Sequence, residues 1–384
     1  MNKQQEIDIL SHLISIKSVN DHEAAVADYI ESLFKPYEDQ GVKIERVSYA
    51  PDRDNLIVTI GEGERMLGFS GHEDVVAPGD LSQWNSDPFK ATIKDNMLYG
   101  RGASDMKSGL AALIAAMLDM LENHHVPGKI RLLCTVGEET GEYGAAQLTK
   151  LGYADNLAGL VIAEPGNDMH EIGYTSKGII DYIVTSKGKG AHSSQPQKGI
   201  NAIDHLIDFA VQVKPLMAKF DKVNPVLGPL THVQSVFNGG EQINSVPAKA
   251  VMKGNIRTIP EYPNQVVFDA LNGLVDQLNQ KPGYDLTIEY SFPEDAMPGD
   301  KDAPLIKLIE HVHDELFDGP IEPKGQDGAS DGSEFLHAKG DFAIALIGPG
   351  NNTQHQSNEC VDLDVYHQSI KFYQQLAEEF FAQP

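Results

Sequence analysis

IRLLCTVGEETGEYG, residues 130–144, joins a mostly apolar run to two adjacent glutamates and then to glycines. A short apolar run of this kind is typical of a strand buried on both faces, as the strands of a parallel sheet are. A second such run, LAGLVIA at 157–163, leads directly into Glu164. Two buried strands in succession predict a sheet covered by helices, with acids where the strands end.

Helical and strand patterns alternate on both sides of this stretch through the first 165 residues. That order predicts an α/β fold with a mostly parallel sheet and helices on both of its faces. The pattern resumes near residue 303 and runs to a closing helix. The other expected helices cover 5–16, 105–123 and 304–316, and the expected strands cover 42–50, 55–60, 66–72, 130–136, 157–163 and 342–348.

The pattern of apolar and polar residues changes at about residue 177, where longer strand patterns and two helical patterns replace the short apolar runs. This predicts an α+β module with an antiparallel sheet, inserted between the two halves of the first domain. A chain of 384 residues also exceeds the size at which one core keeps growing. We therefore expect a first domain of residues 1–176 and 294–384 and a second of 177–293, with strands at 179–188, 231–237, 250–259 and 285–292 and helices at 200–213 and 264–279.

The chain carries a formal net charge of −26, with 41% apolar and 22% charged residues. So acidic a protein is not expected to bind nucleic acid or an anionic membrane, because lysine and arginine recognise both. We expect a small-molecule partner instead. The apolar run at 110–118 is too short to span a membrane, and the first ten residues lack the apolar core of a signal peptide. Two cysteines, Cys134 and Cys360, cannot form a disulfide framework, which favours the cytoplasm.

The stretch GHEDVVAPGD, residues 71–80, begins like a zinc-protease helix but has Val76 where H-E-x-x-H needs its second histidine. On an extended chain, His72 and Asp74 point to one face and Glu73 to the other. A histidine that binds a metal commonly gives its second ring N–H to a carboxylate, and Asp74 is placed for that role. We assign no role to Glu73. Taken alone, the pair also fits an ordinary strand end with a solvated aspartate.

Carboxylates follow several predicted strands, and open α/β sheets build their sites at these carboxyl ends. Asp105 begins a long predicted helix, where an N-cap is the alternative role. Glu138 and Glu139 leave a buried strand together with no basic residue beside them, so a shared cation is the better account. Glu164 ends the next strand, and the loop after the last strand leads to His355.

These side chains amount to two histidines and three carboxylates as metal ligands, with one carboxylate left as a base. Oxygen and imidazole ligands without thiolate suit Zn²⁺, and Co²⁺ or Mn²⁺ can substitute. Charge favours two ions, because Asp105, Glu139 and Glu164 together with one hydroxide balance two divalent cations, whereas the acids around a single ion repel one another. Two ions about 3.5–4 Å apart also clamp the oxygen that develops charge during attack.

Several motifs resemble, in matching order over nearly the whole chain, the co-catalytic zinc deacylases and peptidases. They are GHEDVVAPGD, YGRGASDMKSG, GEETGEYGA, AEP, GKGAHSSQPQKGINAI, GGEQINSVPAKA and GPGNNTQHQSNE. That family includes succinyl-diaminopimelate desuccinylase, acetylornithine deacetylase, aminoacylase and carboxypeptidase G. The resemblance implies one metal on His72 and Glu164, a second on Glu139 and His355, Asp105 as the bridging ligand and Glu138 as the general base.

The same resemblance implies that residues 177–293 form the lid and dimerisation domain of a homodimer. In the HSSQP loop, His192 matches a histidine that crosses the dimer to stabilise the oxyanion. Asn244 and Arg257 match positions that hold the substrate's carboxylate, and a guanidinium can grip a carboxylate through two hydrogen bonds. Ser330 and Asp331 are expected in the substrate pocket. Taken alone, His192 also fits a loop histidine without function, and Arg257 a surface cation.

The resemblance implies the removal of an N-acyl group from an amino acid with a free carboxylate, with succinyl-diaminopimelate as the expected substrate. A glutamate at position 164 resembles the deacylase and carboxypeptidase branches. Acetylornithine and dipeptides are therefore the alternative substrates. A catalytically dead binding protein on the same fold is a further alternative, although every predicted ligand is present.

A serine hydrolase is the rival mechanism, because GASDG fits the nucleophile elbow G-x-S-x-G at Ser330. Asp341 or Asp362, followed by His355 or His367, completes a triad in the right chain order. The elbow needs an apolar strand directly before the serine, whereas the preceding IEPKGQD is polar and contains a proline. The metal site is therefore the favoured prediction.

Overall fold

The computed structural model describes residues 1–383, which form two compact units. The first unit comprises Met1–Tyr174, Gly299–Lys324 and the chain from Ser330 onward, and the second comprises Thr175–Pro298 and Gly325–Ala329. Our expected boundaries at 177 and 293 lie within a few residues of these. Residues 325–329, expected in the first domain, cluster with the second because Gln326 O accepts the N–H of Lys177 at 2.9 Å.

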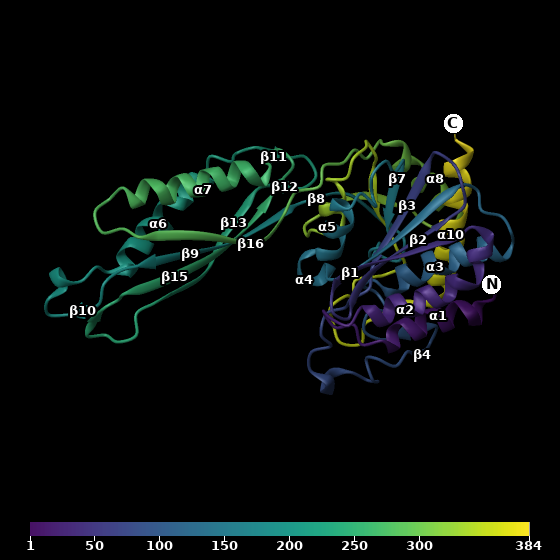
Figure 1. Cartoon of the computed structure of the whole chain (residues 1–384), viewed down its shortest axis with the longest axis horizontal. Helices are drawn as coiled ribbons and strands as arrows, with labels where there is room; N and C mark the ends of the chain where they lie inside the picture. Colours follow the sequence, from purple (N-terminus) through teal and green to yellow (C-terminus); the bar gives the residue numbers. More distant parts are fainter. Residues whose placement is uncertain (384) are drawn as a thin grey trace. The chain divides into compact units, whose positions relative to one another are not determined.

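The first unit is built on one eight-stranded sheet (Figure 1). Its strands in sheet order are β1 (Lys43–Ala50), β2 (Arg53–Ile60), β6 (Lys129–Thr135), β3 (Met66–His72), β7 (Gly159–Ile162), β18 (Ile344–Leu346), β8 (Glu171–Ser176) and β17 (Glu322–Gln326). The central strands β6, β3, β7 and β18 run parallel, while β1, β2 and β8 pair antiparallel with their neighbours. The predicted α/β class with a mostly parallel sheet is thereby confirmed.

Helices cover both faces of this sheet, because successive side chains of a buried strand point to opposite sides. On one face, the ring of Phe69 packs against Tyr373 in α10 (Leu363–Ala382), next to α3 (Lys107–Glu122). On the other face, Arg131 donates to the main-chain oxygen of Tyr153, directly after α5 (Tyr143–Lys150). The unit also contains α1 (Lys3–Ser15), α2 (Ala24–Phe34), α4 (Glu138–Gly141), α8 (Pro304–Leu316), α9 (Gly332–Phe335) and the 3-10 helices η1 (Lys35–Gln40) and η2 (Leu81–Gln83).

A small three-stranded sheet completes the first unit, with the order β19 (Cys360–Asp362), β5 (Met97–Tyr99) and β4 (Thr92–Lys94). The sequence patterns predicted neither this sheet nor α2, β8 and β17. Strands of three residues are too short for a period to appear, whereas the eleven residues of α2 bury Val26, Ile30 and Phe34 at helical spacing, a pattern that was overlooked. Within residues 1–383, none of the helices is both long enough and apolar enough to cross a membrane.

The second unit is a four-stranded antiparallel sheet with two helices on one face (Figure 1). The strands in sheet order are β13 (Thr231–Gly239), β15 (Lys249–Thr258), β9 (Gly178–Lys187) and β16 (Leu286–Glu294), and the helices are α6 (Ala202–Met217) and α7 (Asn264–Asn279). Ile180, Tyr182 and Val184 alternate along β9 and are fully buried under the helices. The predicted antiparallel α+β module is confirmed. The minor elements are β10 (Ala191–His192), β14 (Ser245–Val246), β11 (Val223–Asn224), β12 (Gly228–Pro229) and η3 (Pro196–Lys198).

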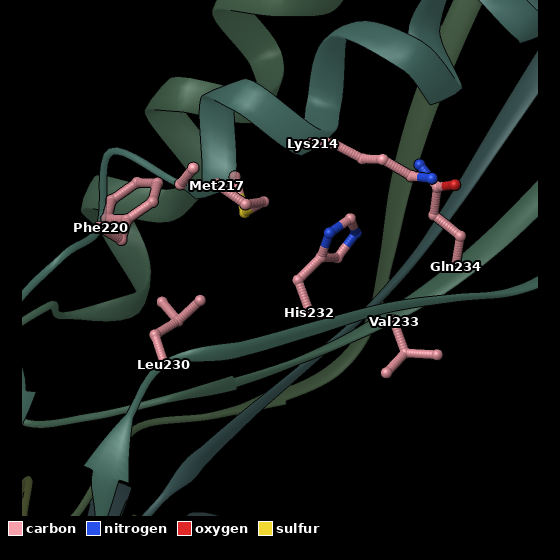
Figure 2. A pocket seen from close by; sticks show the side chains of 8 residues that line it. Lys214, Met217, Phe220, Leu230, His232, Val233 and Gln234 are labelled. Atoms are coloured by element: carbon pink, nitrogen blue, oxygen red, sulfur yellow. The ribbon is translucent and has the colours of Figure 1, made fainter.

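A cavity of about 560 Å³ opens between α6 and β13 of this unit (Figure 2). His232 and Gln234 point from β13 toward α6, whereas Val233 points to the other side of the strand, as the alternation of a strand requires. His232 Nε2 lies 2.7 Å from the hydroxyl of Tyr182, and Gln234 donates to the main-chain oxygen of Ala210 at 2.7 Å. Polar contacts therefore join this edge strand to the rest of the unit.

Candidate metal centre

Five of the predicted site residues lie at or after the carboxyl ends of strands in the large sheet. His72 is the last residue of β3, and Glu138 and Glu139 begin α4 directly after β6. Glu164 follows β7, and His355 lies in the loop after β18. Because β6, β3, β7 and β18 run parallel, these ends lie along one edge of the sheet and the side chains can meet there.

The carboxylate of Asp105 lies between two histidines. Its Oδ1 is 3.1 Å from His72 Nε2, and its Oδ2 is 3.3 Å from His355 Nε2. Asp105 precedes α3, whose N-cap residue is Met106. The alternative role as a helix N-cap is therefore wrong, because both carboxylate oxygens face imidazoles instead of the first amides of the helix.

The remaining acids divide between the same two histidines. Glu139 Oε2 is 3.0 Å from His355 Nε2, whereas Glu164 Oε1 and Glu138 Oε2 lie 3.9 Å and 4.0 Å from His72 Nε2. Ligand atoms of His72, Asp105 and Glu139 all lie within 4.8 Å of one another. The structure thus brings all six side chains into one cluster.

A glycine allows α3 to approach β7 closely. A Cβ atom at Gly109 would lie 2.0 Å from the main-chain oxygen of Ala163, so no other residue fits without moving the helix or the strand. Ala163 directly precedes Glu164, and Asp105 lies two residues before Lys107, the first residue of α3. The close helix–strand contact therefore brings these two acids to the same place.

Asp74 holds the start of α4. Its buried carboxylate accepts the main-chain N–H groups of Glu138 at 3.1 Å and of Glu139 at 3.3 Å. His72 Nδ1 lies 3.7 Å from this carboxylate, and the nearer acceptor is the main-chain oxygen of Asp74 at 2.9 Å. We predicted that the Asp74 carboxylate orients the ring of His72. The shorter contact of His72 Nδ1 is instead with the main-chain oxygen of Asp74.

Burial and charge shift the pKa values across the cluster. Hydrogen bonds to Asp105 and Glu139 raise the pKa of His355 to about 10, and the pKa of Asp105 lies well below its usual range because both histidines outweigh its burial. Burial, together with repulsion between the acids, raises the pKa values of Glu138 and Glu164 well above their usual range. The acids therefore repel one another in the absence of further positive charge.

The donor set fits divalent metal ions. Glu164 Oε1 is buried, and within residues 1–383 it has no hydrogen-bond partner. Such an atom is costly to bury unless a cation or a donor satisfies it. Imidazole nitrogens and carboxylate oxygens without sulfur suit Zn²⁺, Co²⁺ or Mn²⁺.

A second group of ligand-type side chains lies elsewhere on the first unit. His311 and Glu315 of α8 and Glu379 of α10 place their ligand atoms within 4.8 Å of one another. The side chains of His311 and Glu315 are exposed, and Gln375 donates to both glutamates. This surface group lacks the buried, unsatisfied oxygen that distinguishes the central cluster.

Asp331 is fully buried, and its Oδ2 accepts a short hydrogen bond from Thr135 Oγ1. Thr135 is the register partner of His72, so Asp331 lies close to the cluster, and burial raises its pKa to about 7. Ser330 Oγ, also buried, lies 3.3 Å from the main-chain nitrogen of Gly332.

The rival serine triad does not form. His355 is hydrogen-bonded to Asp105 and Glu139, and His367 Nδ1 is paired with Glu6. Neither histidine is therefore engaged with Ser330 as a general base would be.

The remaining predicted residues belong to the second unit. His192 in β10 is the register partner of Ser245 in β14, and Ser193 N–H donates to the main-chain oxygen of Asn244 at 3.0 Å. His192 and Asn244 are thus neighbours on one short ladder. Arg257 lies on β15, partly buried. The roles of these three residues toward the metal cluster stay predictions.

One residue of the site escaped the sequence reasoning. Glu359 lies within the motif HQSNE, yet no role was predicted for it. Its carboxylate is fully buried and accepts the N–H group of Asp105 at 2.8 Å. The available signal was a glutamate placed directly before the apolar pair Cys360 and Val361, where a buried charge needs partners.

The chain is similar to known proteins over nearly its whole length. The sequence pattern of peptidase family M20/M25/M40 matches residues 68–379. A probable succinyl-diaminopimelate desuccinylase from Staphylococcus epidermidis is 36% identical over 407 aligned positions, which cover 99% of this chain and 98% of that protein. A succinyl-diaminopimelate desuccinylase from Wolbachia pipientis is 29% identical, covering 99% of this chain and 94% of that protein.

Solved structures share the fold. Aminopeptidase PepT from Bacillus cereus superposes with a TM-score of 0.77 at 20% identity, over 100% of both chains. The YxeP protein of Bacillus subtilis, described as a dinuclear metal-binding peptidase, has a TM-score of 0.71 at 13% identity, over 100% of this chain and 99% of that one. At sequence identities of 20% and 13%, this structural similarity establishes the fold of the chain alone.

Proposed function

Because the chain belongs to peptidase family M20/M25/M40, we propose that this metal-dependent amide hydrolase removes an N-acyl group from an amino acid at a centre for two metal ions. The observation that carries the proposal is the Asp105 carboxylate, whose two oxygens lie against different histidines. A carboxylate with one oxygen free for each of two ions is suited to bridge them.

His72 and Glu164 would hold one ion, His355 and Glu139 the other, and Asp105 both. The proposed metal is Zn²⁺, for which Co²⁺ or Mn²⁺ can substitute. Bound there, the ions would supply Lewis acidity that acidifies water and polarises the amide carbonyl. The name of the Bacillus subtilis structure supports two ions in a protein of this fold.

Glu138 is the proposed general base. It lies 4.0 Å from His72 Nε2, and the bond from its N–H to Asp74 fixes its main chain. Its carboxylate accepts a proton from water as the water oxygen attacks the amide carbon. The same proton then passes to the departing amine nitrogen as the C–N bond breaks, which leaves a carboxylic acid and a free amine.

The second unit supplies the proposed substrate contacts. His192 Nδ1 lies 2.8 Å from Ser194 Oγ and 3.2 Å from the main-chain N–H of Ser194, and the tautomer that we propose has Nδ1 as the acceptor and the proton on Nε2. That tautomer can donate a hydrogen bond to the developing oxyanion. Asn244 and Arg257 are proposed to hold the substrate's carboxylate, and Ser330 and Asp331 to line the pocket on the first unit.

We propose a homodimer formed through the second unit, which would act as lid and dimerisation domain. Strand β13 stands at the edge of its sheet and exposes Val233, Val236 and Phe237. A long edge strand with apolar side chains favours pairing with another chain, and two-fold symmetry is the commonest solution. The cytoplasmic location expected from the two cysteines stays a prediction.

The names of the relatives support succinyl-diaminopimelate as the substrate. The test is a panel of N-succinyl amino acids, N-acetyl amino acids and dipeptides, compared by kcat/KM with Zn²⁺ or Co²⁺ added. We expect the highest value for succinyl-diaminopimelate. A higher value for acetylornithine or a dipeptide would reject this substrate while leaving the amide-hydrolase class intact.

A further inference from the structure

The carboxylate of Glu359 is fully buried and accepts four hydrogen bonds. Oε1 accepts the main-chain N–H groups of Ser104 and Asp105, each at 2.8 Å. Oε2 accepts the N–H of Gly102 at 2.9 Å and Nη1 of Arg101 at 2.5 Å. One side chain therefore satisfies three main-chain donors of the loop that ends at Asp105, those of Gly102, Ser104 and Asp105.

Arg101 supplies the charge that makes this burial tolerable. Its side chain is also buried, so the ion pair with Glu359 is shielded from water. Nη2 donates to the main-chain oxygen of Ala77 at 3.3 Å, and the guanidinium lies 5.3 Å from the ring of Trp84. Arg101 thereby holds the Glu359 carboxylate in place, and Arg101 is itself held by its contacts with Ala77 and Trp84.

The same contacts join two stretches of chain that carry proposed metal ligands. Gly100 N–H donates to the main-chain oxygen of Glu359 at 3.0 Å. Ser104 Oγ donates to the main-chain oxygen of Asn351 at 2.8 Å and accepts the Asn351 N–H at 2.8 Å. Hydrogen bonds therefore join the loop that carries Asp105 to the segment that carries His355 at two places, one on each side of His355 in the sequence.

We infer that Glu359 is a positioning residue for the metal-bridging Asp105. The inference rests on the proposed two-ion centre and assigns to Glu359 no contact with metal or substrate, because each of its carboxylate oxygens already accepts two hydrogen bonds from the protein. By holding the Asp105 amide, Glu359 fixes where the carboxylate oxygens point. Both ions share Asp105, so a displaced loop weakens both sites at once.

The direct test is Glu359→Gln, which keeps the shape of the side chain. An amide offers one acceptor oxygen, so in either orientation its NH₂ group faces two of the four donors. The loop is expected to shift and Kd to rise about 10- to 100-fold for the bound ions. Kd is measured by titrating metal-free protein with Zn²⁺ against a competing chelator, and the ligand geometry by the absorption spectrum of the Co²⁺ form.

Two further variants separate positioning from general loss of stability. Glu23→Gln breaks a second glutamate–arginine pair, between the buried Glu23 and the partly buried Arg53, whose hydrogen bonds to each other do not reach the Asp105 loop. It should lower the unfolding temperature but leave Kd for Zn²⁺ near the wild-type value. Ser104→Ala removes only the side-chain bonds to Asn351, so it should raise Kd in the same direction by a smaller factor, and it remains informative if Glu359→Gln does not fold.

The outcomes distinguish this inference from the proposed function. If wild-type protein binds no metal at the cluster, the two-ion centre itself is rejected. If wild type binds two ions and folded Glu359→Gln binds them with unchanged Kd, the positioning role is wrong and the centre stands. Equal metal loss in Glu23→Gln would also overturn it, because destabilisation alone would then explain the effect.

Discussion

Glu139 and His355 are 216 positions apart in the chain, yet Glu139 Oε2 lies 3.0 Å from His355 Nε2. His355 has a φ of 60°, in the left-handed region that few residues other than glycine adopt. Such a conformation persists only where surrounding contacts impose it, and it is common at functional sites. The loop thus directs this imidazole toward the glutamate.

Removal of metal should abolish activity. Dialysis against a chelator is expected to give inactive protein, and repletion with Zn²⁺ to restore activity at about two ions per chain. The His355 side chain is 51% exposed while that of His72 is buried, so the ion at His355 should leave first. Elemental analysis during dialysis checks the count. Full activity without bound metal, or inactivation by a serine-directed fluorophosphonate, would reject the metal mechanism.

The surface group of His311, Glu315 and Glu379 provides a control for the predicted count of two metal ions per chain. His311→Ala removes its only nitrogen ligand. We expect the variant to keep two tightly bound ions and wild-type activity. If one of the two ions disappears with His311, the central cluster holds a single ion and the bridging role of Asp105 is wrong.

Alanine substitutions at the adjacent residues Glu138 and Glu139 should have different effects on metal content and on kcat. Glu138→Ala is expected to keep its metal and lose about 10²- to 10⁴-fold in kcat, as when a general base is removed. Glu139→Ala should release one ion, because Glu139 contacts His355. Metal content and kcat are measured on the same preparations. Equal metal loss from both variants would contradict the assignment.

His192 is predicted to act in the neighbouring subunit's site. His192→Ala should stay folded and metal-loaded while kcat falls about 10²- to 10³-fold, the usual effect of losing one oxyanion donor. Exchange of subunits with Glu138→Ala then creates heterodimers with one complete site. We expect activity to return, up to about half the wild-type value per heterodimer. Isolated heterodimers no more active than their parents would show that His192 does not act across the dimer.

His313 predicts a dependence of stability on pH. The side chain is fully buried, with ring centroids 5.0 Å from Phe317 and 5.3 Å from His170, and burial lowers its pKa below the usual value. Below about pH 6.5 the unfolded chain gains this proton before the folded one does, so the contribution of His313 to stability falls as the pH falls.

The measurement is the unfolding temperature of metal-free protein between about pH 7.5 and 5.5. His313→Leu should become more stable relative to wild type as the pH falls over that window, whatever slope the raised pKa values of His72 and His355 give to both proteins. His311→Ala, on the exposed face of the same helix, is the control for the loss of a histidine from α8. Identical slopes for wild type and His313→Leu would show that another group causes the pH dependence.

The sequence by itself determined the fold class and the acids at the sheet edge. Periods of two and 3.6 residues report which side of a segment is buried, and parallel strands end together, so His72, Glu139 and Glu164 were expected to meet. The three-residue strands were missed because so few residues show no period, whereas the helical period of α2 was present in the sequence and was overlooked.

Only the tertiary structure decided which atoms meet. The two oxygens of Asp105 face His72 and His355, the Asp74 carboxylate binds the α4 amides, and Glu359 gathers the donors of the Asp105 loop. These contacts join loops distant in the chain, whose conformations follow from packing and from the need to satisfy buried polar groups. Loops carry no periodic pattern, so their side-chain contacts cannot be read along one segment alone.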